Sequence, residues 1–509
     1  MKSIEQLRRD AKALKRAHSA GEASAQARVA AHAPRTGQEA PSAGELKHAD
    51  YLHVIAREQG FASWPSLKSA AEATGLDHAQ KVQSLKIALH HGQTWRVEKL
   101  LSETPSLPDG LFALQVSLLN RSEVERMLRE DPGRATRTFG PRRPMLHLAF
   151  SRWVHSRPEL AGDMLAIAQL LVDHGANVND SCPAAEGSPH RLSALYGAIG
   201  HADNMVLARW LLEQGANPDD GESLYHATEL GHHDGLRMLL EFGADPAGTN
   251  ALLRAMDFND HTAVRLLLDA GARADDFDDT PVGGERPWVM PALHQAARRM
   301  CDREMIELLL EGGADPARSY QGATPYGYGR VFGNRALVEA LEARGPVPAL
   351  TPVEAALAAS AEGRDVAGHP LSGVDLPEAY RDILRNILHL PEKLPQVKRL
   401  VALGLDPDLA DPEGLTPVQV AGWEGLPDVF GYFLGLGPDL LHVNAYGGGL
   451  IDTIIHGSEN CPARAERDHV RCAELALQAG APLRPDMVRG AGVPEMAAVL
   501  ERWMQTHPD

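Results

Sequence analysis

Apolar residues recur at helical spacing in many short segments of this chain, and each segment ends at a glycine. A period of three to four residues predicts a short amphipathic helix with one buried face. The glycine stands where a helix needs a left-handed residue in order to end, and the Asp, Asn or Pro that follows most copies directs the chain into a turn. The clearest copies are residues 207–218, 235–246, 263–274, 305–316, 396–407 and 470–482.

A second recurring segment precedes these helices, and in several copies it begins with Thr-Pro and contains alanines. The threonine hydroxyl is suited to cap free backbone amides, and proline fits the first helical turn, where no N–H donor is needed. We therefore expect a first helix, packed closely through its alanines, before each glycine-terminated helix. The copies are residues 144–151, 193–200, 223–231, 291–299, 324–333, 351–360 and 416–425.

Together the two segments resemble the ankyrin repeat, which reads Thr-Pro-Leu-His, two alanines, Gly-His, a Val-Leu-Leu-Leu helix and Gly-Ala-Asp. The match is best at residues 292–316, 224–246 and 416–439. The resemblance implies an all-α fold, namely an ankyrin-repeat solenoid of paired antiparallel helices. With degenerate copies counted, it predicts roughly ten to twelve helix pairs between about residue 80 and the C-terminus.

The spacing of the turn glycines is irregular. Gly215, Gly243 and Gly271 follow one another at intervals of 28 residues, shorter than the roughly 33 residues of a standard ankyrin unit. These units are therefore expected to lack a full finger hairpin. Inserted segments at 275–290 and 457–468 lengthen two other units, and insertions of this kind project from a solenoid surface.

Residues 1–76 lack the repeat pattern and are expected to form an N-terminal helical cap module. Residues 4–14 have a helical apolar face, and residues 1–20 carry six basic side chains against two acidic ones. After an Ala-, Gly-, Pro- and Ser-rich linker near 31–45, the motif AREQGFASWPSL at 56–67 resembles a short element that precedes ankyrin repeats in many bacterial proteins. It implies a cap that shields the first repeat.

Two repeat arrays are expected to follow this module, a first over 77–349 and a second, more degenerate one with a C-terminal cap over 350–509. The unit at 444–460 resembles a variant repeat found at the end of such bacterial proteins. It has Gly449 and Leu450 in place of the Thr-Pro start, which weakens the predicted capping of its helix.

Composition narrows the function classes. A formal net charge of −18 and a pI near 5.7 argue against nucleic-acid binding, which depends on lysines and arginines neutralising phosphates. The four cysteines are far apart in sequence and form no CxxC pair, which favours a reducing compartment. The chain shows neither a signal-peptide pattern nor a run of 18 apolar residues, so no membrane span is expected. We expect a cytoplasmic protein.

Most histidines are expected to be structural. His147 and His294 occupy the Leu-His position, where the resemblance implies hydrogen bonds between adjacent turns, and His232 occupies the Gly-His position. His226 lies on a core-facing position of its helix. The aspartates of 275–279 lack the spacing and the closing glutamate of a calcium loop. No metal site, cofactor or catalytic residue is assigned.

The leading hypothesis for function is a protein-binding scaffold or adaptor. Ankyrin proteins generally bind other proteins through the concave face and turn tips, which the resemblance extends to this chain. The acidic balance favours a partner with a basic patch. Residues that depart from the repeat rule toward aromatic or charged side chains are the predicted partner-binding set: Trp153, Tyr196, Asp257, Trp288, Tyr326, Arg330 and Trp423.

The alternative is an enzyme or small-ligand binder with a pocket on the concave face, under the 275–290 or 457–468 insertion. Its candidate residues are His226, His456 and Ser458. A catalytic serine needs a base within hydrogen-bond reach and an oxyanion site opposite it. Adjacency in sequence does not supply that geometry, and a turn held by local polar hydrogen bonds is the competing interpretation of this segment.

Overall fold

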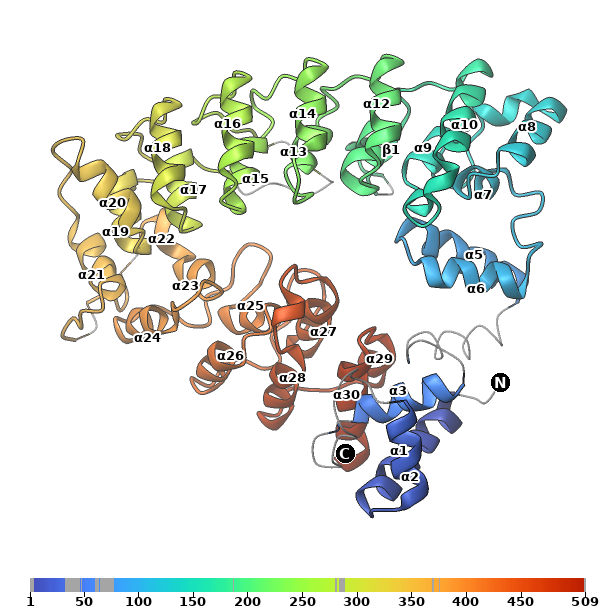
Figure 1. The fold of residues 1–509 in the computed structure, drawn as a ribbon. Helices are drawn as coiled ribbons and strands as arrows, with labels where there is room; N and C mark the ends of the chain where they lie inside the picture. Colours follow the sequence, from blue (N-terminus) through green and yellow to red (C-terminus); the bar gives the residue numbers. More distant parts are fainter. Residues whose placement is uncertain are drawn as a thin grey trace. The chain divides into compact units, whose positions relative to one another are not determined.

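The computed structural model describes residues 4–32, 46, 48–59, 64, 77–185, 187–279, 282, 289–368, 370–374 and 376–507. The chain divides into two compact units, and Figure 1 labels the helices and strands along the chain. The first comprises residues 1–254 and 278–288, and the second comprises residues 255–277 and 289–509.

The first unit contains an N-terminal module followed by helix pairs. Its elements are α1 (Ile4–Ser19), α2 (Ala23–Ala31), α3 (His48–Glu58), α5 (His78–His90), α6 (Thr94–Glu103), α7 (Phe112–Ser117), α8 (Arg121–Glu130), η1 (Pro132–Ala135), α9 (Pro144–Ala149), η2 (Trp153–His155), η3 (Pro158–Leu160), α10 (Ala161–Asp173), β1 (Ser181–Pro183), β2 (Arg191–Ser193), α11 (Ala194–Tyr196), η4 (Gly197–His201), α12 (Met205–Glu213), α13 (Ser223–Ala227) and α14 (Asp234–Glu241).

The second unit continues with helix pairs, and α15 (Ala251–Asp257) spans the division between the units. Its other elements are α16 (His261–Asp269), α17 (Ala292–Arg298), α18 (Arg303–Glu311), α19 (Pro325–Phe332), α20 (Arg335–Glu342), α21 (Pro352–Ala361), α22 (Glu378–Arg381), α23 (Ile383–Ile387), α24 (Leu394–Ala402), α25 (Pro417–Trp423), α26 (Pro427–Leu434), α27 (Leu450–Asn460), η5 (Arg464–Glu466), α28 (His469–Gln478), α29 (Pro485–Gly490) and α30 (Pro494–Thr506).

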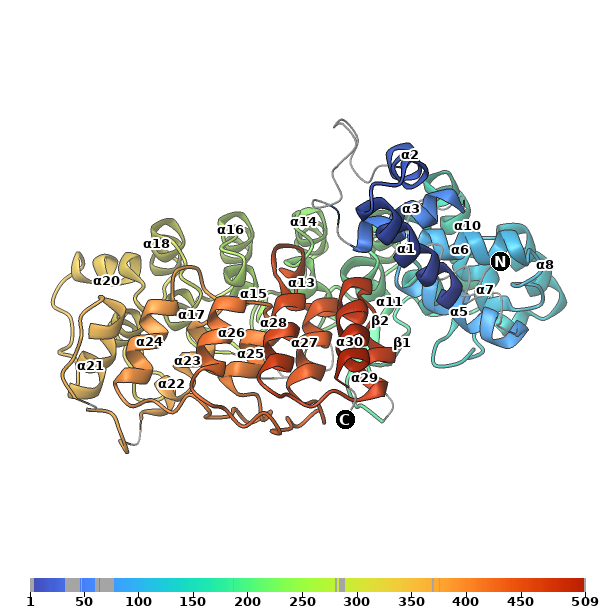
Figure 2. The same cartoon turned by 90° about the horizontal axis from the view of Figure 1, so that it is seen from below.

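The helix pairs stack in two rows within each unit. In the second unit the first helices α17, α19 and α21 pack in succession, as do α25 and α27, while the second helices α18 and α20 pack on each other, as do α26 and α28. In the first unit α10, α12 and α14 form a second-helix row. Figure 2 shows these paired helices from a second direction. The apolar period seen in the sequence therefore corresponds to faces buried between neighbouring pairs.

Threonine caps start the first helices, as the Thr-Pro segments predict. The hydroxyl oxygens of Thr324 and Thr351 accept hydrogen bonds from the backbone N–H of the residue three positions on, at 3.1 and 3.2 Å. Helix α27 lacks this threonine. There the Asp452 carboxylate accepts from the backbone N–H of Gly449 at 3.0 Å, so another polar group supplies the helix start that the sequence left weak.

The predicted left-handed turns are present. Gly243 ends the second helix α14 with a φ of 86°, a conformation that costs a residue with a Cβ about 1–2 kcal/mol. The other turn glycines of the six quoted segments also have positive φ: Gly215, Gly271, Gly313, Gly404 and Gly480.

Side chains connect successive turns in the first unit. The Asn179 side chain accepts from the backbone N–H of Asn217 at 2.7 Å, and the Asp219 carboxylate accepts from the backbone N–H of Asp245 at 2.7 Å. The Asn or Asp that directly follows the Gly-Ala of each turn stabilises its own turn instead: Asn217 accepts from the backbone N–H of Asp219 at 3.2 Å, and Asp245 accepts from that of Ala247 at 2.9 Å.

Two features of the first unit were not predicted. Residues 181–183 and 191–193 form a two-stranded antiparallel sheet, in which Ser181 pairs with Ser193. Helix α2 extends up to the expected linker and is held to α3 by two hydrogen bonds of 2.7 Å from Arg28 to Glu58.

The N-terminal module has its own apolar core, which includes Leu7, Leu14, Tyr51 and Trp64. The apolar face of the first helix is thus confirmed. Of the motif at 56–67, residues 60–63 and 65–67 lie outside the described residues, and its role as a cap stays a prediction.

Replacing Gly243 by alanine tests the turn. The space around a Cβ at this position is open, so the only cost is the left-handed backbone, about 1–2 kcal/mol. We expect Gly243→Ala to lower the urea midpoint of unfolding, followed by circular dichroism.

The matched control is Gly162→Ala. Gly162 lies within α10, where a Cβ also meets open space, and alanine is favoured over glycine inside a helix by about 0.5–1 kcal/mol. This variant is expected to keep or raise the midpoint. Equal behaviour of the two variants would show that backbone conformation does not limit the turn.

Candidate functional site

The histidines of the repeat motif bond to backbone or to neighbouring repeats. His147 Nε2 lies 2.9 Å from the carbonyl oxygen of Phe139, and His294 Nε2 lies 3.1 Å from that of Ala323 in the next turn. Burial lowers the pKa of His294 to about 4, so its ring is neutral near pH 7. His232 Nε2 lies 2.9 Å from the Asp203 carboxylate. His294 therefore connects adjacent turns as expected, whereas the hydrogen bond of His147 lies within its own repeat.

A row of aromatic and histidine rings in contact with one another crosses the first helices of the first unit. His201 stacks on His90 with a centroid separation of 4.2 Å and contacts Phe150 at 5.1 Å. Tyr196 continues the row, at 5.9 Å from Phe150 and 4.9 Å from His226. Burial lowers the pKa of His90 to about 3 and that of His201 to about 4. The first part of the row is therefore uncharged at neutral pH.

The row ends in a charged cluster around His226. Its Nε2 lies 3.2 Å from the Glu222 carboxylate, whose side chain is fully buried, and its Nδ1 lies 2.6 Å from Glu229. His190 contacts the other oxygen of Glu222 at 2.5 Å, and Arg254 Nε donates to Glu229 at 2.7 Å. The predicted core-facing His226 is thus the centre of a network drawn from three repeats.

Two carboxylates determine the charge of His226. Burial by itself lowers the pKa of this imidazole, but the hydrogen bonds with Glu222 and Glu229 outweigh burial and raise the pKa to about 9. The same contacts hold the pKa of Glu229 below its usual value, although burial opposes this. The cluster is therefore a set of ion pairs around the fully buried Glu222, with the His226 and Glu229 side chains 15% and 27% exposed.

Three of the predicted partner-binding residues lie on the first helices of the second unit and make polar contacts there. The Tyr326 hydroxyl donates to Glu342 at 3.0 Å and accepts from Arg330 at 2.8 Å, and only 6% of Tyr326 is exposed. Asp257 accepts from Gln295 at 2.5 Å and from Arg299 at 2.6 Å. Asp257 therefore connects neighbouring repeats, whereas the contacts of Tyr326 lie within its own helix pair, and the part of these residues in partner binding stays a prediction.

The predicted partner-binding set also contains the tryptophans Trp423 and Trp288. Trp423 ends α25 half-buried, and its carbonyl oxygen accepts from His469 Nε2 at 2.8 Å. Trp288 lies outside the described residues.

His456 and Ser458 lie on α27, and the structure does not join them as a nucleophile and a base. The Ser458 hydroxyl donates to the Ile455 carbonyl at 2.6 Å within the helix, and His456 is exposed, with its Nδ1 3.0 Å from the Asn460 amide. Among the described residues no contact links the two side chains. Helix α27 itself extends to Asn460, so the start of the 457–468 insertion is helical.

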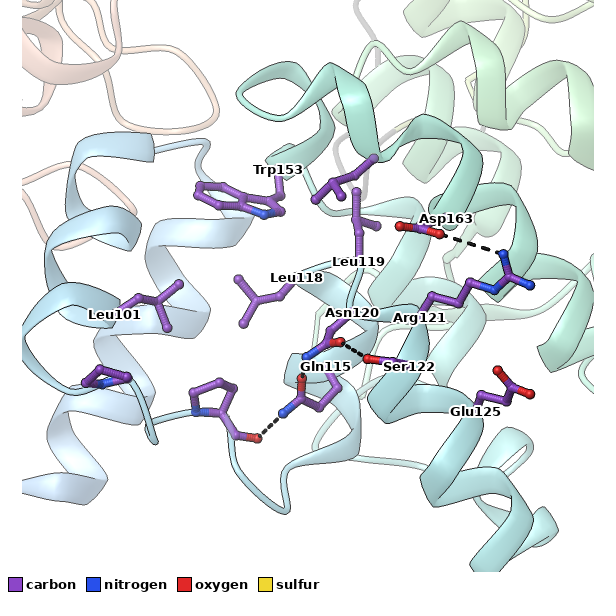
Figure 3. A pocket seen from close by; sticks show the side chains of 13 residues that line it. Leu101, Gln115, Leu118, Leu119, Asn120, Arg121, Ser122, Glu125, Trp153 and Asp163 are labelled. Atoms are coloured by element: carbon purple, nitrogen blue, oxygen red, sulfur yellow. Dashed lines mark hydrogen bonds and ion pairs between the residues drawn. The ribbon is translucent and has the colours of Figure 1, made fainter.

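A groove of about 630 Å³ runs beside Trp153 in the first unit (Figure 3). Leu118 and Leu119 contribute apolar walls, and Arg121 lies 3.8 Å from Asp163 on one side. Trp153 is 7% exposed, so the indole packs into the wall of the groove. The predicted role of Trp153 in partner binding stays a prediction.

The largest concentration of exposed apolar side chains lies in a loop that sequence reasoning did not select. The loop connects α26 to α27, and it exposes 72% of Leu441, 56% of Val443 and 77% of Tyr446. The preceding loop connects α24 to α25 and exposes carboxylates. We call this set the finger surface; it comprises Asp406, Asp408, Glu413, Asp439, Leu441, Val443 and Tyr446. The available signal was the group of large apolar residues between Pro438 and the glycines 447–449, namely Leu440, Leu441, Val443 and Tyr446.

Comparison with protein families agrees with the geometry of the helix pairs. The model for ankyrin repeats in three copies matches residues 195–280, and the single ankyrin-repeat model matches residues 290–319. These segments are ankyrin repeats. The all-α ankyrin-repeat fold expected from the sequence is confirmed, and the exception among the described residues is a small two-stranded sheet.

Solved ankyrin-repeat structures resemble parts of the chain. The ankyrin repeat domain of Bcl-3, a member of the IkappaB protein family, is 22% identical over 47% of this chain and 99% of its own, with a TM-score of 0.34. A domain from Acinetobacter baumannii AYE is 22% identical over 39% and 96%, with a TM-score of 0.30. The ankyrin repeat domain of human ASB11 is 19% identical over 51% of this chain and 98% of its own, with a TM-score of 0.21. No curated protein sequence matches the chain.

The described residues bear on three kinds of feature, namely a metal site, a membrane-spanning helix and a disulfide bond. No group of three or more His, Cys, Asp or Glu side chains among them is arranged to hold a metal ion. None of the described helices has the length and apolar character needed to cross a membrane. All four cysteines are buried and unbridged.

The charged state of His226 is open to direct measurement. Because its pKa of about 9 lies above the ordinary value of about 6.5, its ion pairs stabilise the fold fully below about pH 6.5 and lose that contribution as pH rises through about 9. We expect the imidazole signals of His226 to titrate near pH 9 by NMR. We also expect His226→Gln to destabilise the protein more at pH 6 than at pH 10.

His456→Gln is the control, because His456 is exposed on α27. This variant is expected to change the free energy of unfolding by a small and nearly constant amount between pH 6 and pH 10. A midpoint between pH 6 and 7 for His226 would contradict the ion-paired arrangement.

Proposed function

We propose that this protein is a binding scaffold for another protein, and that the finger surface is a principal contact. Ankyrin repeats generally serve in protein interactions, and two segments of the chain match their family models. The observation that carries the proposal is the exposure of Leu441, Val443 and Tyr446. A folded protein usually buries side chains of this size or uses them in contacts, and clustered apolar exposure marks interaction sites.

The loop that carries these side chains is held by hydrogen bonds. The buried Asn444 side chain accepts from the backbone N–H of Tyr446 at 3.1 Å and from that of Gly448 at 3.0 Å. The backbone N–H of Ala445 donates to the Glu413 carbonyl in the preceding loop at 2.8 Å. His442 Nε2 lies 2.6 Å from the Gly414 carbonyl oxygen. A loop fixed in this way loses little further freedom on binding, which favours affinity.

The first-helix residues form a second part of the proposal. Tyr196, Tyr326, Arg330 and Trp423 lie on first helices, as do Asp257 and its partners, while Trp153 borders the groove of Figure 3. The partner-binding role of these side chains rests on their departure from the repeat rule. Tyr326→Ala with Trp423→Ala tests this part separately from the finger surface.

The finger surface is tested by a double substitution, Leu441→Ser with Tyr446→Ser. Both side chains are more than two-thirds exposed, so helicity by far-ultraviolet circular dichroism should not change. We expect proteins captured from a lysate of the source organism to fall at least about tenfold, as loss of central apolar contacts does in other interfaces. Quantitative mass spectrometry measures the change.

Val206→Ser with Phe258→Ser is the matched control. Each of these side chains is 52% exposed and lies away from the two finger loops in sequence. It is expected to leave capture unchanged. The proposal fails for this surface when both double variants capture the same proteins in the same amounts as the wild type.

A further inference from the structure

The finger surface lies in a segment without positive charge. Residues 400–463 contain no lysine or arginine, although they contain nine aspartates and glutamates. The segment therefore accounts for half of the formal net charge of −18. Such a run is unusual beside exposed apolar side chains, because solvated acidic loops normally carry small or polar residues.

We propose that the finger surface binds a partner protein through a segment in which lysines or arginines alternate with large apolar side chains. This inference rests on the proposed scaffold function and names the chemistry of its partner. It is carried by the placement of exposed carboxylates beside Leu441, Val443 and Tyr446 on two adjoining loops.

The two loops form one continuous surface. The contacts from Ala445 to Glu413 and from His442 to Gly414 join their backbones. Asp408 is close enough to Asp439 in the next loop for their charges to interact. Partial burial and the repulsion from Asp406 and Asp439 raise the pKa of Asp408. These carboxylates are exposed and mutually repulsive, so a cationic ligand gains from neutralising them.

Backbone hydrogen bonds hold two of these carboxylates in ordered turns. The Asp406 carboxylate accepts from the backbone N–H of Asp408 at 2.9 Å, and the Asp439 carboxylate accepts from the backbone N–H of Leu441 at 2.9 Å. Each of these acids fixes its own loop with one oxygen, and the negative charge remains at the surface. The backbone N–H from which the Asp439 carboxylate accepts belongs to the exposed Leu441, two residues on, so charge and apolar area are adjacent.

Other occupants fit this surface less well. Phosphate-bearing ligands meet repulsion from the carboxylates. The basic helix α1 of a second copy has the right charge, but its apolar side chains Leu7, Ala11 and Leu14 are buried in its own module. The exposed face of α1 therefore offers nothing to cover Leu441 and Tyr446. A segment that combines both features satisfies the whole surface.

The inference is tested by selecting binders to the full-length protein from a displayed library of random 16-residue peptides. We expect the selected peptides to be enriched in Lys and Arg interleaved with Leu, Phe, Ile or Trp, and depleted of Asp and Glu. Binding of the enriched peptides, measured by fluorescence anisotropy, should weaken about tenfold or more between low and high salt, because screening shortens the reach of charge interactions.

Two variants separate the charge and apolar contributions. Asp406→Asn, Asp408→Asn and Asp439→Asn together keep an acceptor oxygen for each turn and remove three charges, and we expect an affinity loss of about tenfold. Leu441→Ser with Tyr446→Ser should cause a comparable or larger loss. The matched control neutralises three exposed acids on second helices, Glu213→Gln, Asp269→Asn and Glu311→Gln, and should change the affinity less than about twofold.

Three results would overturn the inference. One is selection of peptides without net positive charge, or of none that lose affinity in the two variants. Another is equal binding of a polyarginine peptide without apolar residues. The third is self-association by light scattering that disappears when α1 loses its basic side chains. If any of these occurs while lysate capture still depends on Leu441 and Tyr446, the scaffold function stands and only the partner chemistry fails.

Discussion

Each helix pair of this protein has an apolar face that only a neighbouring pair can cover, and this need for a neighbour governs the rest of the structure. Close stacking of first helices requires small residues. A Cβ at Gly422 would lie 2.8 Å from Ile454, and one at Gly457 would overlap the carbonyl oxygen of Trp423. Because the helix faces are committed to this stacking, large side chains with other roles are found in the loops and along the first-helix row.

Features set by local backbone chemistry could be predicted from the sequence. The left-handed turn glycines of the quoted second helices, the threonine caps at Thr324 and Thr351 and the hydrogen bond of His294 to the next turn follow from requirements within a few residues or from a repeated contact between copies. Helix α27 starts without the threonine cap, because the Asp452 carboxylate accepts from the backbone N–H of Gly449. The repeat motif gives no indication of this substitute hydrogen bond. Helix α2 was missed because its Ala-rich sequence has a weak apolar period.

The contacts around the candidate site residues could not be predicted, because spacing along the sequence does not determine which side chains meet. Glu222 meets both His190 and His226 although His190 lies 32 residues away along the chain. Tyr326 and Trp153 carry aromatic rings at unusual repeat positions, but burial of these rings followed from neighbours that no pattern specifies. The finger surface is the reverse case: Leu441 and Tyr446 look like ordinary apolar residues, and only the fold shows that their side chains are exposed.

The stretch without lysine or arginine also limits how this region is detected. Trypsin cleaves after those residues, so residues 400–464 remain on a single long peptide that ends at Arg464. Reagents that join or label primary amines likewise find no side chain on which to react there. Mapping contacts of these loops by mass spectrometry therefore calls for cleavage at acidic or aromatic residues and for carboxylate-directed cross-linkers.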